Sequence, residues 1–251
     1  MNFEKSRLSH ADLLGLKRWN TPTIYNALEQ LAPENLHQMV NREETRDFMP
    51  HQGPMIGYAV TVVIQPGNPE HRNNKVAWSE YRAYMGNMPG PKIVVVQDLD
   101  KPEAYGAFWG EVNSNRHRAL GCVGTITDGA IRDLDEMNSS GFKAIARRMC
   151  VGHAFSTPVR WNCEVEVFGT RVRPGDLVHA DKHGFIIIPL AHQERILEAA
   201  RFMDDSECET VIPSGTDTAG KSISEILDEI NRSNLENARR CKEKFDKNGE
   251  W

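Results

Sequence analysis

Two charged side chains, Arg132 and Asp133, stand side by side in the stretch GCVGTITDGAIRDLDE at residues 121–136. A short apolar strand is predicted at 122–126, a tight turn at Asp128-Gly129 and a helix over 131–139. The arginine and the aspartate should therefore lie at the start of that helix. Arginine can hold a substrate anion through its planar fork, and aspartate can ligate Mg²⁺ or Mn²⁺. The pattern thus predicts small-molecule chemistry. Alternatively, Asp133 and Glu136 simply complement a helix N-terminus.

A second candidate lies upstream, where a helix is predicted from about residue 109 to about 120. The backbone amides of Gly110, Glu111, Val112 and Asn113 would open this helix and point outward with partial positive charge, which suits a carboxylate or a phosphate. Gly110 would let a ligand approach the backbone closely. An ordinary glycine at a helix start is the alternative interpretation.

Two further groups of polar residues are open to more than one interpretation. Asp98 and Asp100 follow an apolar strand and either lie near the site or cap a loop. His179, Asp181 and His183 would share one face of an extended chain and could hold a metal. However, the sequence around 181–184 is typical of a turn, which favours a hairpin.

The elements that must position these residues alternate along the chain. Strands are predicted at 55–64, 93–96, 122–126 and 142–146, and helices lie between them, which favours parallel pairing in an α/β core. The region 9–47 is predicted to be helical. Residues 66–90 form a polar loop with a short helix at 76–85.

The second part of the chain follows a different pattern. Short strands separated by turn signals indicate an antiparallel meander, with strands at 164–168, 171–173, 177–180 and 185–188. Helices are predicted over 190–203 and 222–245. We therefore expect one α/β domain over residues 1–203 and a C-terminal helical extension over 204–251.

The composition excludes several classes of protein. The chain has 251 residues, 39% apolar content and a formal net charge of −5, with no basic run, so direct binding to nucleic acid is not expected. No apolar run is long enough to span a membrane, and no secretory signal is recognisable. The five cysteines include no CxxC pair, so free thiols in a reducing cytoplasm are expected. Glycine-rich nucleotide loops and the G-x-S-x-G elbow are also missing from the sequence.

The segment WGEVNSNRHRALGCVGTITDGAIRDLDEM, followed by GF and VRPGDLVHADKHGFIIIP, resembles the RraA-like family. That family includes the regulator of ribonuclease E activity A and the class II 4-hydroxy-4-methyl-2-oxoglutarate/4-carboxy-4-hydroxy-2-oxoadipate aldolases. The resemblance covers about residues 20–200 and is firmest at 106–189. It implies a β/β/α swivelling-type sandwich, with N-terminal helices and a C-terminal helical arm in this chain. It also implies a homotrimer or a dimer of trimers with active sites between subunits.

The resemblance also implies residue roles. Asp133 matches the direct ligand of a divalent metal, usually Mg²⁺ or Mn²⁺. Arg132 matches the residue that binds the pyruvate moiety, and the amides of residues 111–113 match the site for its carboxylate. Glu111 matches an acidic residue that holds a metal-bound water, although some aldolases have the shorter aspartate there. A glutamate from a neighbouring subunit is matched most nearly by Glu207 or Glu209.

The function expected from this resemblance is a metal-dependent carbon–carbon lyase. It would cleave a 4-hydroxy-2-oxo acid to pyruvate and would also decarboxylate oxaloacetate. The alternative is a non-catalytic, protein-binding regulator. A methyltransferase is not expected, because no glycine-rich loop for S-adenosylmethionine is present. The 66–90 segment, with Trp78 and Tyr81, is longer than expected for the family and could reshape the pocket.

Overall fold

A computed structural model describes residues 8–31, 34–72 and 74–247. The chain divides into two compact units. The first comprises Met1–Thr21 with His37–Leu190, and the second comprises Pro22–Leu36 with Ala191–Trp251. The predicted boundary at residue 203 falls inside α6 (Gln193–Glu209).

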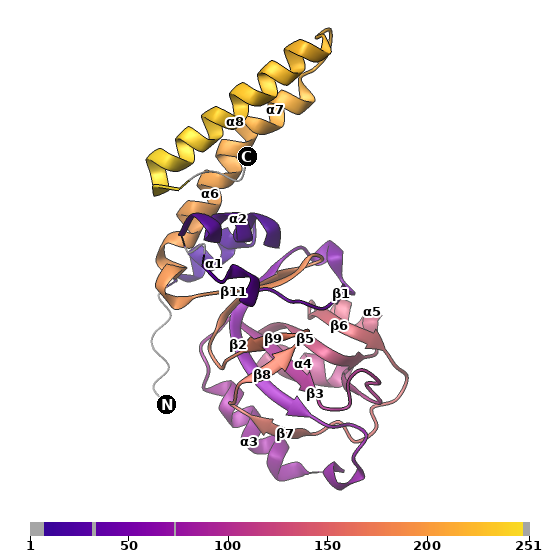
Figure 1. The fold of residues 1–251 in the computed structure, drawn as a ribbon. Coiled ribbons are helices and arrows are strands. Elements are labelled where there is room, and N and C mark those ends of the chain that lie inside the picture. The colour runs from indigo at the N-terminus through magenta and orange to yellow at the C-terminus, as the bar shows by residue number, and fades with distance from the viewer. Residues whose placement is uncertain (1–7, 32–33, 73, 248–251) are drawn as a thin grey trace. The chain divides into compact units, whose positions relative to one another are not determined.

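Within the described part of the first unit, nine of the eleven strands form one sheet (Figure 1). Its centre is parallel, in the order β6-β5-β3-β2. Every residue of β2 is buried, as expected for a strand covered on both faces. The predicted parallel α/β core is therefore confirmed, and its central strands are β2 (Met55–Ile64), β3 (Lys92–Asp98), β5 (Cys122–Ile131) and β6 (Lys143–Met149).

Antiparallel strands extend this sheet at both edges. On one side β10 pairs with β2 and with β11, and on the other β1 pairs with β6. The sequence did not predict β4, which runs parallel to β5, or β7, which pairs with β2. The predicted meander is present as β8 and β9, which form a separate pair, and as the β10–β11 hairpin. These strands are β1 (Arg46–Asp47), β4 (Ala107–Trp109), β7 (Pro158–Trp161), β8 (Val165–Val167), β9 (Thr170–Val172), β10 (Leu177–Asp181) and β11 (Gly184–Ile188).

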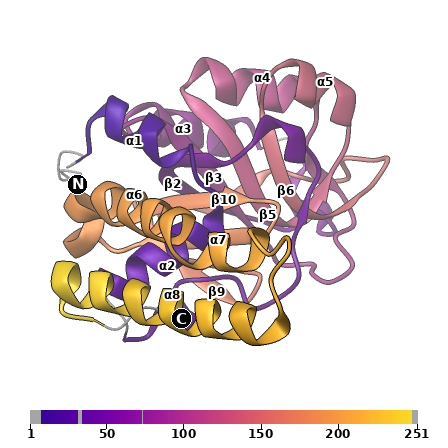
Figure 2. The ribbon, with the colours of Figure 1, turned by 90° about the horizontal axis from the view of Figure 1, so that it is seen from above.

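The helices of the first unit follow the predicted positions with shifted ends. In Figure 2, α4 and α5 lie side by side next to β5, and α4 contacts both elements. The polar loop at 66–90 contains α3, as expected. These helices are α1 (His10–Leu16), α3 (Lys75–Gly86), α4 (Glu111–Ala119) and α5 (Leu134–Ser139).

The predicted turn at Asp128-Gly129 is wrong, because both residues lie inside β5. Asp128 Oδ1 accepts the backbone N–H of Asp98 at 2.7 Å, and Oδ2 accepts Lys101 Nζ at 2.8 Å. Gly129 is needed there because a β-carbon would lie 2.8 Å from Asp98 Oδ2. The dipeptide therefore serves close packing between β3 and β5 rather than a reversal of the chain.

The helical prediction for 9–47 is also wrong in its last part. A short 3₁₀ helix (Leu36–Gln38) follows α2 (Thr21–Leu31), and the region ends in β1. Residues 32 and 33 lie outside the described residues. Pairing with β6 imposes on β1 an extended backbone that a helical pattern in the sequence cannot reveal.

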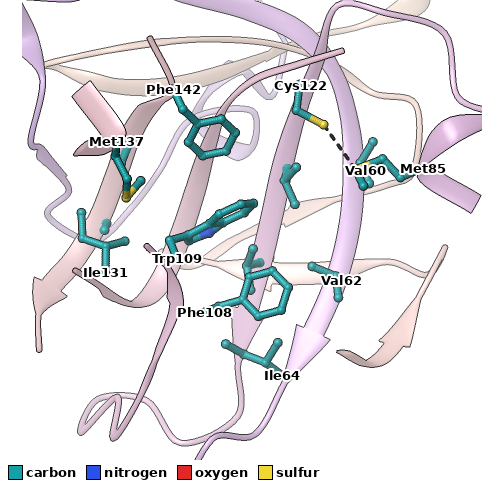
Figure 3. Packing of buried hydrophobic residues seen from close by; sticks show 14 of the residues in the cluster. Val60, Val62, Ile64, Met85, Phe108, Trp109, Cys122, Ile131, Met137 and Phe142 are labelled. Atoms are coloured by element: carbon teal, nitrogen blue, oxygen red, sulfur yellow. Dashed lines mark hydrogen bonds between the residues drawn. The ribbon is translucent and has the colours of Figure 1, made fainter. Parts of the chain in front are cut away.

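Aromatic side chains take part in the hydrophobic core cluster of Figure 3, where Phe108, Trp109 and Phe142 are labelled. The Trp109 ring lies 4.7 Å from that of Phe142 and 5.1 Å from that of Phe108, between ring centroids. Phe108 in turn stacks on Trp78 of α3 at 5.3 Å, with the planes 8° apart. This cluster therefore fixes β4, which leads directly into the first turn of α4.

The second unit is helical where it is described, with α6, α7 (Val211–Thr216) and α8 (Ile223–Phe245) in mutual contact (Figure 1). Ser222 and Glu225 form a capping box at the start of α8. The buried hydroxyl of Ser206 donates to Asn237 Oδ1 at 2.6 Å, which joins α6 to α8. The predicted C-terminal helices are thus present, with α7 between them.

Candidate functional site

Strand β4 and helix α4 bring the two parts of the predicted site together. Trp109 pairs with Ile131, the last residue of β5, and its carbonyl accepts the backbone N–H of Arg132 at 3.1 Å. Gly110 is the N-cap of α4, and Asp133 is the N-cap of α5. The two helix starts therefore meet at one edge of the sheet.

The Asp133 carboxylate lies at the N-terminus of α4. Its Oδ2 accepts the backbone N–H of Glu111 at 3.0 Å and lies 3.7 Å from Arg132 Nε. A β-carbon on Gly110 would lie 2.5 Å from the same oxygen, so only glycine leaves room for this arrangement. Asp133 itself has a left-handed backbone, with φ 55° and ψ 50°. Such strain in a non-glycine residue is typical of functional sites.

A cavity of about 530 Å³ opens beside this pair, a volume within the usual range for small-molecule sites. The start of α4 contributes Gly110, Val112 and Asn113 to its lining, and Arg132 and Asp133 complete that side. The first amides of a helix have no intrahelical partner, so those of Val112 and Asn113 are suited to an anion in this cavity.

Helix α3 supplies another wall of the cavity through Lys75, Trp78 and Arg82. These residues come from the segment that the sequence identified as an unexpected insertion. Arg116 of α4 and His153 also line the cavity. Trp78 was named from the sequence, but Lys75, Arg82 and Arg116 were not, because they form no local motif and lie on two separate helices.

A buried polar pair joins α3 and α4, the two helices that contribute to the cavity wall. The Tyr81 hydroxyl and His117 Nε2 are 3.0 Å apart, and His117 Nδ1 is 2.7 Å from the carbonyl oxygen of Asn113. Burial lowers the pKa of His117 to about 4. The ring is therefore neutral at pH 7, with Nδ1–H donating to Asn113 and Nε2 accepting from Tyr81. This contact ties α3 to α4.

Several predicted site residues lie elsewhere. Glu111 and Glu136 are exposed on α4 and α5, and neither side chain lines the cavity. Glu207 belongs to α6 in the second unit, where its Oε1 accepts Asn26 Nδ2 at 3.3 Å. Glu209 pairs there with Arg240 at 2.7 Å.

Asp98 and Asp100 form a separate acidic group outside the lining of the cavity. Asp98 is fully buried, its Oδ1 accepts the N–H of Asp100 at 2.9 Å, and its Oδ2 has no hydrogen-bond partner. Burial, opposed by that hydrogen bond, raises the pKa of Asp98 to about 7. Of the two interpretations, these contacts favour aspartates that cap a loop over aspartates that belong to the site.

The H-x-D-x-H run belongs to the β10–β11 hairpin. His179 Nδ1 lies 3.0 Å from the Thr21 hydroxyl, and Asp181 accepts the backbone N–H groups of Thr21 and His183. Burial lowers the pKa of His179 to about 4. These contacts hold the start of α2, which agrees with the hairpin interpretation.

Asp133 is the residue best placed to hold a divalent cation. Across residues 8–31, 34–72 and 74–247, no group of three or more His, Cys, Asp or Glu side chains is arranged around a common metal position. A single carboxylate with free water nevertheless fits Mg²⁺, which usually keeps several waters and takes one or two protein carboxylates. The donor set therefore fits a hard cation completed by water and substrate oxygens.

A family model described as "RraA-like: Aldolase/RraA" matches residues 21–187. The chain belongs to the RraA-like family. This match spans both the Gly110 and the Asp133 segments, so the resemblance predicted from the sequence is confirmed. None of the helices that the structure describes combines the length and the apolar composition of a membrane-spanning segment.

Three known proteins that resemble this chain share between 21% and 27% of its residues over the matched region. A Halalkalibacterium halodurans protein named "Putative 4-hydroxy-4-methyl-2-oxoglutarate aldolase" is 27% identical over 66% of this chain and 74% of its own length. Protein DlpA of Legionella pneumophila is 22% identical over 64% of this chain, and the match covers only 26% of that protein. The crystal structure of Streptomyces coelicolor RraAS2, from the RNase ES inhibitor RraA protein family, superposes with a TM-score of 0.64. It is 21% identical and covers 81% of this chain and 96% of that one, which establishes the shared fold.

Proposed function

We propose that the protein is a divalent-metal-dependent lyase that cleaves a 4-hydroxy-2-oxo acid to pyruvate, with oxaloacetate decarboxylation as a side activity. One observation carries the proposal. The Asp133 carboxylate, the Arg132 guanidinium and the α4 N-terminus meet at a cavity of about 530 Å³ in an RraA-like chain. The named aldolase relative from Halalkalibacterium halodurans supports the same reaction class.

Substrate binding would use the start of α4 and Arg132. The amides of Val112 and Asn113 would hold the C1 carboxylate of the 2-oxo acid, helped by the partial positive charge of the helix N-terminus. Arg132 would then face the C2 oxygen. Its Nη1 donates to the carbonyl of Val151 at 3.3 Å, and its Nε faces Asp133, so the guanidinium is oriented on two sides.

The chemistry requires stabilisation of negative charge at the C2 oxygen. When the C4 hydroxyl loses its proton and the C3–C4 bond breaks, the electron pair moves into the pyruvate enolate. Arg132 would stabilise the charge on that oxygen. A Mg²⁺ or Mn²⁺ ion bound at Asp133 would supply Lewis acidity. The Glu111 side chain lies outside the lining of the cavity in the single chain, so it would have to turn toward the cavity to hold the water that takes the proton of the C4 hydroxyl and returns one to C3.

The test is pyruvate release from oxaloacetate and from 4-hydroxy-4-methyl-2-oxoglutarate, first with EDTA and then with added Mg²⁺ or Mn²⁺. We expect turnover that EDTA removes and the metal restores, and that Asp133→Ala abolishes without changing the oligomeric state. Unchanged activity in Asp133→Ala would contradict the proposal.

A non-catalytic regulator is the second candidate, favoured by the fold shared with the RNase ES inhibitor family. A binding module has no need for a strained aspartate against a helix N-terminus. Capture of a ribonuclease by the protein, together with no metal-dependent turnover, would reverse the preference. We also propose that the protein forms a trimer or a dimer of trimers, in which Glu207 of one subunit reaches the site of its neighbour.

A further inference from the structure

The wall of the cavity formed by α3 and α4 carries more positive charge than a pyruvate site requires. Four cations line the cavity, whereas Asp133 is the sole carboxylate in the same lining among the described residues. The positive charge of Arg132 is balanced by the Asp133 carboxylate, which lies 3.7 Å from its Nε. Lys75, Arg82 and Arg116 make no ion pair with any carboxylate in the described part of the chain.

Arg82 is held in position although it lacks a counter-charge. Its guanidinium lies 4.8 Å from the centre of the Trp78 ring, and Trp78 is itself stacked on Phe108. Its Nε is buried and has no hydrogen-bond partner. Burial and, next, the neighbouring Arg116 guanidinium lower the pKa of Arg82. Two neighbouring guanidinium groups, one of them with a buried and unpartnered N–H, cost folding free energy, and a bound anion would offset this cost.

Arg116 lies farther along α4 than the first amides of the helix, which are proposed to bind the 2-oxo acid. Val112 and Arg116 are four residues apart on α4, so they share the face that lines the cavity. Arg116 is six residues beyond Gly110, about 9 Å along the helix axis. Because the first amides of α4 and Arg116 line the same cavity, a ligand held by those amides can extend toward Arg116.

We propose that Lys75, Arg82 and Arg116 form a second anion subsite that binds a phosphate ester at the end of the substrate remote from the 2-oxo acid. A carboxylate has one charge and is matched by one arginine fork, whereas a phosphate monoester has a charge of about −1.5 to −2 and three acceptor oxygens. Three cations therefore favour the phosphate. That this phosphate ester is a substrate rests on the proposed lyase function, whereas the existence of the anion subsite does not.

The experiment measures binding of inorganic phosphate to the full chain by calorimetry, with acetate at the same ionic strength as the comparison. No turnover is needed, so a failure of the lyase proposal cannot be confused with a failure of this one. We expect phosphate to bind more tightly than acetate. Arg82→Gln and Arg116→Gln should each weaken phosphate binding by about 10-fold or more.

Arg118→Gln is the matched control, because it removes the same charge from the same helix. Arg118 does not line the cavity, and its Nη1 donates to the carbonyl of Gly141. Arg116 is exposed, so its variant keeps the test valid even if Arg82→Gln fails to fold. Phosphate that binds no better than acetate, or that binds equally well to Arg116→Gln and Arg118→Gln, would overturn the proposal.

Discussion

The α-carbon of Gly110 lies against the carboxylate of Asp133, so closely that a β-carbon there would come within 2.5 Å of Asp133 Oδ2. Gly110 has an extended backbone, with φ −170° and ψ −174°, which any residue can adopt. The requirement for glycine is therefore steric and arises from the site. It connects the start of α4 with the residue proposed to hold the metal.

Gly110→Ala should therefore damage activity more than stability. The added methyl group would push the Asp133 carboxylate away from the Glu111 amide, and a misplacement of about 1 Å in an active site can cost about 100-fold in rate. We expect metal-dependent pyruvate release to fall by about that factor, while the thermal unfolding midpoint changes little. Gly86→Ala is the control, since a β-carbon there meets no atom within 4 Å. Full activity in Gly110→Ala would show that metal-dependent pyruvate release does not depend on the position of the Asp133 carboxylate.

Arg132→Lys should also lower activity, although it keeps the charge. The arginine uses Nη1 toward the Val151 carbonyl and Nε toward Asp133, whereas an ammonium group has no planar fork to do both. A loss of about 10- to 100-fold in kcat is expected from poorer stabilisation of the enolate. Steady-state kinetics of Arg132→Lys and of the control Arg118→Lys measure this effect. Equal rates for both variants would remove Arg132 from the mechanism.

The sequence predicted the pieces of the site better than the cavity around them. The bounds of β2 were predicted correctly, because a long β-branched run has a clear signal. Strand β5 was predicted too short, because its Asp128-Gly129 pair resembles a turn until the contacts with Asp98 and Lys101 are known. Such contacts depend on strand pairing between distant segments.

The cationic wall was missed for a related reason. Lys75, Arg82 and Arg116 have ordinary polar surroundings in the sequence, and only the packing of α3 against Phe108 and α4 brings them to one cavity. By contrast, Arg132 and Asp133 are adjacent in the chain, so a local pattern was enough to identify them.

His117 should make the protein less stable in mild acid. Burial lowers its pKa from 6.5 to about 4, so between these values the unfolded chain binds a proton that the folded chain does not. The free energy of unfolding therefore falls as the pH drops from about 6.5 to about 4. His179 acts in the same direction, whereas Asp98, whose pKa is raised to about 7, acts in the opposite one.

The variant His117→Gln isolates the contribution of His117. Between pH 6 and 4.5, its free energy of unfolding should depend on pH less steeply than that of the wild type, by up to about 1.4 kcal/mol per pH unit. Urea unfolding at several pH values provides the measurement. An identical slope in the two proteins would mean that His117 is protonated equally in the folded and unfolded chains.

The most direct test of the central claim follows the methyl protons of pyruvate in D₂O by NMR. Enolate formation exchanges these protons for deuterium, and pyruvate lacks the distal half of the substrate, so the test does not depend on knowing that half. We predict exchange with Mg²⁺ or Mn²⁺, no exchange above the protein-free rate with EDTA, and its loss in Asp133→Asn. Exchange that is absent in the metal-loaded wild type, or that persists in Asp133→Asn, would contradict an enolate-forming site at Asp133.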